Sequence, residues 1–319
     1  MPNQIQITDS GASRRFLPLL LLLFAGSGCS ALIYEIVWYQ LLQLVIGSTV
    51  ISLGVLLATF MGGLCLGSLA LPRIRPLAGR HPLRVYALVE MGIGICGILV
   101  LFGMPLVDRV YVAAVGHGLP AMLLRAAVAA ACLLPPTVLM GASLPAASRW
   151  LRATPEGVSW MGLLYGGNTV GAVFGCLLAG FYLLRVFDMA AATLVAAAIN
   201  AAVALIAFGM ASRTPHQAGA EEPPATPVVE AAPAPGSWPI YVTIALSGAC
   251  ALGAEVVWTR LLGLLLGATV YTFSIILAVF LAGLGIGSAV AAALVRSLAR
   301  PRLALGWCQM LLAGAVAWT

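Results

Sequence analysis

The chain alternates between long apolar segments and short polar stretches. A helix needs about 20 apolar residues to cross the hydrocarbon core of a bilayer, so each long segment predicts a membrane-spanning helix. We expect nine spans, at residues 16–38, 48–71, 83–105, 121–147, 160–184, 188–210, 239–259, 269–294 and 303–319. The ninth reaches the last residue without a polar flank, which favours a fragment of a longer protein.

Composition identifies the solvent of these segments. Of 319 residues, 62% are hydrophobic and only 8% are charged, whereas soluble proteins have about 25% charged residues. Such a chain cannot cover a water-facing surface, so its main partner is the lipid bilayer. The net charge of +6 therefore does not indicate a nucleic-acid partner. No motif in residues 1–319 indicates a catalytic residue, a metal or a cofactor.

The arginines between the spans predict the orientation. Most of them fall on one side of the membrane, which the positive-inside rule assigns to the cytoplasm. We therefore expect a multi-pass protein of the inner (plasma) membrane with a cytoplasmic amino terminus. These arginines are Arg14, Arg15, Arg73, Arg75, Arg80, Arg84, Arg149, Arg152, Arg213, Arg296, Arg300 and Arg302.

An Ala- and Pro-rich stretch divides the chain. Residues 211–237 have no apolar period, which predicts a flexible cytoplasmic linker. We expect a cytoplasmic tail at 1–15, a first unit of six transmembrane helices at 16–210, and helices seven to nine at 238–319.

The segment after the linker repeats the beginning of the chain. Residues 27–68 align with 247–288 at a constant offset of 220, with 20 identities in 42 positions and no gap. The third span continues the match after a one-residue deletion, with Glu90 opposite Gln309. Both copies would begin on the cytoplasmic side because six spans intervene. The repeat is therefore parallel, as in transporters built from two six-helix halves.

Glu35 and its repeat equivalent Glu255 are the strongest candidates for a site, because ionisable residues inside a membrane are costly and are usually functional. If the first span ends near an interfacial Trp38, Glu35 lies about one turn from the outer edge. The repeat would place the two acids on opposing helices, where they could bind a cation or exchange protons. Alternatively each Glu is a structural clamp at its helix end. Arg260 follows Glu255 by five residues, but its counterpart Gln40 is neutral, so no symmetric ion pair exists.

Two other polar residues in the spans each allow a structural and a functional interpretation, and several aromatic residues are further candidates. Glu90 is either functional or paired with Arg84 or Arg73. Asn168 lies among glycines that indicate close helix packing, and it either joins helices or contacts substrate. The aromatic candidates for a cation–π face are Tyr34, Trp38, Tyr39, Trp258 and Tyr271.

Four stretches resemble a known family. They are "SGCSALIYEIVWYQLLQLVIGST" (27–49), "LPPTVLMGASLP" (134–145), "LYGGNTVGAVFGCLLAGF" (164–181) and "SGACALGAEVVWTRLLGLLLGATVYTFS" (247–274). They are similar to the membrane region of bacterial fusion proteins that join a major-facilitator-like module to a spermidine-synthase-like domain. The resemblance implies an all-α polytopic membrane protein with a major-facilitator-like parallel repeat, truncated here after about three helices of the second unit. It also implies a carboxy-terminal synthase-like partner domain outside this chain.

Two functions follow as expectations. The chain is a transporter-like module that moves or binds polyamines or related organic cations, with candidate residues Glu35, Glu255, Glu90, Trp38, Trp258, Tyr34, Asn168 and Arg260. Alternatively it is a membrane scaffold that anchors an aminopropyltransferase-like domain. In that reading the acids stabilise helix ends and no substrate crosses. A third reading is a membrane subunit whose helices only assemble with partners.

Overall fold

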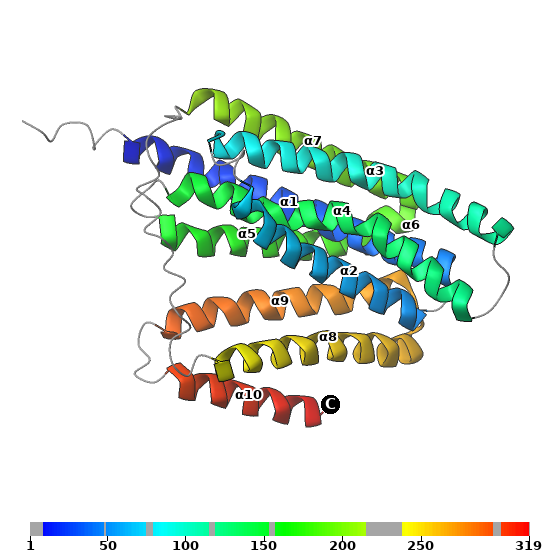
Figure 1. Ribbon diagram of the computed structural model, residues 1–319. Coiled ribbons are helices and arrows are strands. Elements are labelled where there is room, and N and C mark those ends of the chain that lie inside the picture. The colour runs from blue at the N-terminus through cyan, green and yellow to red at the C-terminus, as the bar shows by residue number, and fades with distance from the viewer. Residues whose placement is uncertain are drawn as a thin grey trace, which may run out of the picture.

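The computed structural model describes residues 9–47, 49–74, 79–114, 119–152, 157–214, 238–295 and 301–318. Every regular element in these ranges is helical (Figure 1). The long helices are α1 (Asp9–Ile46), α2 (Thr49–Ala70), α3 (Pro82–Ala114), α4 (Leu119–Arg152), α5 (Gly157–Leu178), α7 (Met189–Arg213), α8 (Trp238–Leu266), α9 (Val270–Val295) and α10 (Pro301–Trp318). The short elements are a 3₁₀ turn at Leu71–Arg73, a π-helical turn at Ala179–Leu183 and α6 at Leu184–Val186.

Eight of these helices are long and apolar enough to cross a membrane, namely α1 to α5 and α7 to α9. The chain therefore has the helices of a multi-pass membrane protein. The predicted ninth span corresponds to α10, whose apolar part, Arg302–Trp318, is shorter than the other spans. Residues 215–237, most of the predicted linker, lie outside the described part of the chain, as do residues 1–8 of the predicted tail.

The first predicted span ends too early. Helix α1 does not end near Trp38 but continues to Ile46, and α8 likewise continues to Leu266 rather than ending at 259. Trp38 is only 1% exposed, so its expected place in an interfacial belt is wrong. Glu35 therefore lies eleven residues before the helix end, about 16 Å of helix rise, instead of about one turn.

Helix α1 lies near the centre of the bundle, between α7 on one side and α5 on the other (Figure 1). Helix α9 packs on α5, and α8 and α10 follow at the edge of the molecule. Small residues bring α1 and α5 together. Gly171 faces the carbonyl group of Ala25, and Asn168 faces Gly28 so closely that a side chain at position 28 would overlap it. Asn168 is therefore part of a close helix–helix contact.

The sequence repeat has structural counterparts. Three local features recur at aligned positions. They are positive φ angles at the helix-ending glycines Gly47 (82°) and Gly267 (91°), ring contacts Trp38–Phe60 (6.4 Å) and Trp258–Phe280 (5.5 Å), and hydrogen bonds Ser27–Glu90 (2.7 Å) and Gln309–Ser247 (3.3 Å). Helices α1 to α3 and α8 to α10 thus share three local features at aligned positions.

Candidate functional site

Glu35 on α1 and Glu255 on α8 are both buried within the described part of the chain. They are 2% and 5% exposed, and they lie within electrostatic range of each other. Cys176 of α5 lies close enough to interact with both. In each carboxyl group the Oε1 atom has no hydrogen-bond partner in the described part of the chain. Buried polar atoms almost always have a partner, so these two oxygen atoms are candidates for contact with a ligand or ion.

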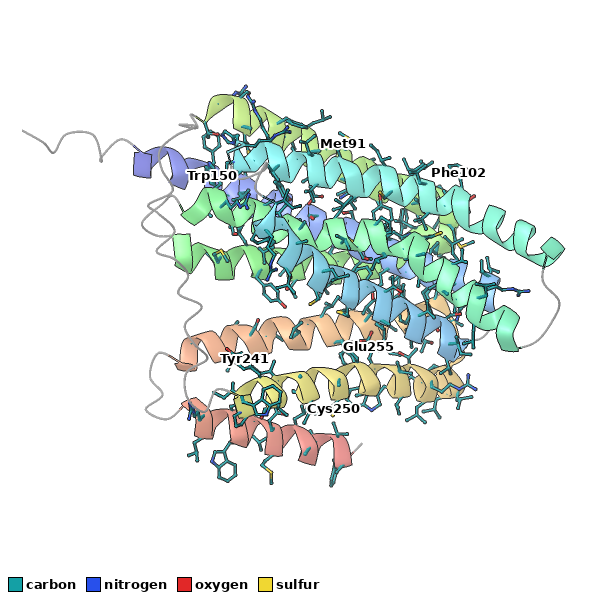
Figure 2. The ribbon with its side chains drawn as sticks, in the orientation of Figure 1. Met91, Phe102, Trp150, Tyr241, Cys250 and Glu255 are labelled. Carbon is teal, nitrogen blue, oxygen red and sulfur yellow. The ribbon has the colours of Figure 1, made fainter. Side chains whose placement is uncertain are left out.

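The orientation of α8 supports this interpretation. Of its 29 residues, all within the described part, only Glu255 is buried. Figure 2 shows Glu255 on the side of α8 that faces α9 and the bundle, while Cys250 is exposed. Helix α8 therefore contributes one buried side chain to the described part of the chain, and that side chain is ionisable. It presents that carboxyl group to the first unit.

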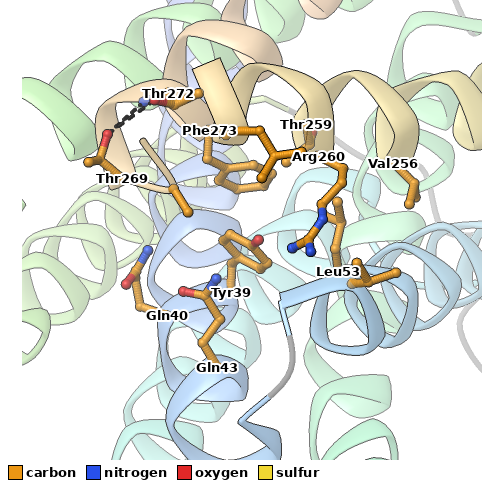
Figure 3. A pocket seen from close by; sticks show the side chains of 14 residues that line it. Tyr39, Gln40, Gln43, Leu53, Val256, Thr259, Arg260, Thr269, Thr272 and Phe273 are labelled. Atoms are coloured by element: carbon orange, nitrogen blue, oxygen red, sulfur yellow. Dashed lines mark hydrogen bonds between the residues drawn. The ribbon is translucent and has the colours of Figure 1, made fainter. Parts of the chain in front are cut away.

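A polar pocket lies one helical turn from the acids, toward the ends of α1 and α8 (Figure 3). Its cavity measures about 60 Å³ and its walls come from α1, α2, α8, α9 and the turn between α8 and α9. Residues four apart on a helix share one face. Tyr39 therefore lies above Glu35 and Thr259 above Glu255, each about 6 Å further along its helix, and both line the pocket. Glu35 and Glu255 themselves are not among the residues that line the pocket.

The pocket walls carry several hydrogen-bonding groups. They belong to Tyr39, Gln40, Gln43, Thr259, Arg260, Thr269 and Thr272. The Thr272 hydroxyl donates to the carbonyl oxygen of Gly267 at 2.8 Å and lies 3.1 Å from the Thr269 hydroxyl. The ring of Tyr39 packs on Phe273, with centroids 4.3 Å apart. Figure 3 shows Arg260 reaching across the pocket toward Tyr39 and Gln43.

Glu90 belongs to a separate cluster. Its Oε1 accepts a hydrogen bond from Ser27 Oγ and its Oε2 accepts one from Asn200 Nδ2, both at 2.7 Å. These bonds join α1, α3 and α7 in the core of the first unit, where Glu90 and Asn200 are 0% exposed. The expected partners of Glu90 in the structural reading, Arg84 or Arg73, are replaced by these two neutral donors. Two neutral hydrogen bonds satisfy a carboxyl group in the interior without placing an arginine there.

The remaining candidates lie outside the pocket. The Tyr34 ring stacks on Trp38 at 5.4 Å and packs against Gly97, so it is fully buried between α1 and α3. Trp258 packs on Phe280. Of the predicted aromatic residues only Tyr39 lines the pocket. Tyr271 packs on Phe181 instead. Gln43, Thr259 and Thr272 line the pocket but were not predicted as site residues. For Thr259 a signal existed, because it lies four residues after Glu255 and so shares a helix face with it.

Within the described residues, no group of three His, Cys, Asp or Glu side chains could hold a metal ion. Comparisons of the chain with protein-family models, with curated proteins and with solved structures give no match.

Proposed function

We propose that the chain is the membrane-embedded unit of a transporter for small organic cations, polyamines among them, in which Glu35 and Glu255 hold the positive charge. The observation that supports it is the pair of buried acids, one from each repeat, with an unpartnered oxygen on each. The proposal includes a major-facilitator-like parallel repeat, a cytoplasmic amino terminus in the inner membrane, and a synthase-like partner domain, all suggested by the sequence.

The energetics of the pair favour a cationic ligand. A charged carboxylate at the centre of a membrane helix costs about 3 kcal/mol, and a second one nearby adds repulsion between like charges. An ammonium group that arrives between the two acids offsets both terms. The polar pocket one turn further along gives such a ligand hydrogen-bonding groups on its way to the pair.

The test is uptake of radiolabelled putrescine and spermidine into vesicles from cells that express the protein. We expect Glu35→Gln and Glu255→Gln each to lower the apparent affinity about tenfold or more, since each removes a charge-assisted interaction. The double variant should lose uptake. The matched control is Asp188→Asn, which removes a carboxylate at the amino-terminal cap of α7 but retains an oxygen to accept the bond from the Ala191 N–H.

Normal uptake by the double variant, at equal expression, would exclude these acids from the mechanism. The alternative function, a membrane scaffold for an aminopropyltransferase-like domain, has a different signature. In that case the vesicles take up no organic cation, and the double variant changes only the thermal stability of the protein.

A further inference from the structure

Arg260 gives the pocket an unexpected charge. It is the only charged side chain among the pocket-lining residues of the described chain. A pocket used only by a polyamine has no need of a guanidinium group, which would repel every amino group of such a ligand. Arg260 in the pocket wall and the two buried acids, each about one helical turn from a lining residue, instead suggest a site with two poles.

The sequence repeat shows that only the second unit has this positive charge. The position equivalent to Arg260 is Gln40, and both residues line the same pocket from opposite units. Their neighbours Glu255 and Glu35 are identical. The two halves therefore share the acid, while only one half supplies the guanidinium group.

We propose that the substrate is a diamino acid, a zwitterion with a second amino group, whose carboxylate binds Arg260 and whose side-chain ammonium group points to Glu35 and Glu255. This inference rests on the proposed transport function and narrows its substrate class. Along α8, Arg260 follows Glu255 by five residues, about 7.5 Å of rise. The side chain of a basic amino acid spans that distance.

The pocket walls suit such a ligand. A guanidinium group has five N–H donors in a fork that matches a carboxylate, so it binds one while it keeps a contact within the protein. The Thr259 hydroxyl lies between the two poles, one turn above Glu255, and it has no hydrogen-bond partner in the described part of the chain. The Tyr39–Phe273 ring pair offers an apolar wall for the methylene groups of the ligand.

Ornithine and putrescine form the matched probe pair, because they differ only by the carboxylate. Binding of each radiolabelled compound is measured with the purified protein in nanodiscs, and uptake is measured in vesicles. The wild-type protein should prefer ornithine by at least about tenfold, the effect expected of one charged hydrogen-bonding contact. Arg260→Gln, which installs the residue of the other unit, should abolish this preference and bind putrescine as well as or better than the wild type does.

Two further variants separate charge from structure. Arg260→Lys keeps the charge and should retain part of the preference. The exchange variant Gln40→Arg with Arg260→Gln moves the guanidinium group to the other wall and should restore part of it. Recovery in the exchange variant would not follow if Arg260 only supported the fold.

Equal binding of ornithine and putrescine by the wild type would overturn the diamino-acid inference and leave a cation transporter. An equal loss of both ligands in Arg260→Gln, without recovery in the exchange variant, would also overturn it. If a folded wild-type protein binds neither ligand, the proposed function itself fails.

Discussion

The contact between α1 and α5 can be tested with one methyl group, because the repeat supplies its own control. Gly28 faces Asn168 in the first unit, and its equivalent Gly248 has open space around it in the second. A Cβ atom at position 28 would overlap the carbonyl oxygen of Asn168. It would also lie 2.9 Å from Asn168 Oδ1 and 3.0 Å from the carbonyl carbon, where ordinary contact begins at 3.4 Å. Helix α5 would have to move away from α1.

That movement determines the size of the effect. The same seam holds Gly171 against Ala25 and Gly175 against Cys29, so a gap opened at position 28 weakens the other close contacts too. Overpacking of this kind costs about 1–3 kcal/mol. At position 248 the added methyl group meets nothing, and replacing glycine in a helix stabilises it by about 0.5–1 kcal/mol. Position 28 is helical too and gains the same amount, so this gain cancels, and we expect Gly28→Ala to be less stable than Gly248→Ala by about 1–3 kcal/mol.

The assay is unfolding of both variants by titration with a denaturing detergent, with helix content followed by circular dichroism. Transport by Gly248→Ala should be unchanged, which establishes that the variant protein is assembled normally. Equal unfolding free energies for the two variants would refute the close contact between Gly28 and Asn168, and with it the packing role of Asn168.

Two further predictions concern buried or strained positions. Glu90→Leu should lower the unfolding free energy by about 2–4 kcal/mol, because the donors on Ser27 and Asn200 lose their acceptor. The control Glu90→Gln should retain most of the stability. Similar losses for the two variants would contradict the hydrogen-bonded cluster. Gly267→Ala should lower the unfolding free energy by about 1–2 kcal/mol, because a φ of 91° is strained for any residue with a side chain. The control Gly263→Ala, inside a helix, should lower it less. Both are measured by the same titration, and an unchanged unfolding free energy for Gly267→Ala would contradict the strain.

Hydropathy alone was enough to predict the helices, but not what each apolar residue faces. The apolar run of α1 extends to Ile46, and nothing in its composition tells a lipid-facing residue from one that packs on protein. Trp38 therefore looked like an interfacial residue, although it is buried against Phe60. The repeat relates Glu35 and Glu255 by sequence, and both are buried.

The cluster around Glu90 could not be predicted in this way. Its partners Ser27 and Asn200 are 63 and 110 residues away along the chain, and only the packing of α1, α3 and α7 brings them together. An acid in an apolar segment suggested an arginine partner because opposite charges attract. In the interior, neutral donors meet the same need without the cost of burying a second charge.

The differences between the two units carry as much information as the identities. A residue that only closes a helix contact can be an acid in one copy and an amide in the other, since Glu90 and Gln309 both bond to the equivalent serine. In the proposed site both acids act on the same ligand, so the charge has to be present in both copies, as it is at Glu35 and Glu255. A group needed once, such as a guanidinium for one carboxylate, must come from a single unit. The proposed diamino-acid site therefore expects a neutral residue opposite Arg260, and Gln40 is that residue.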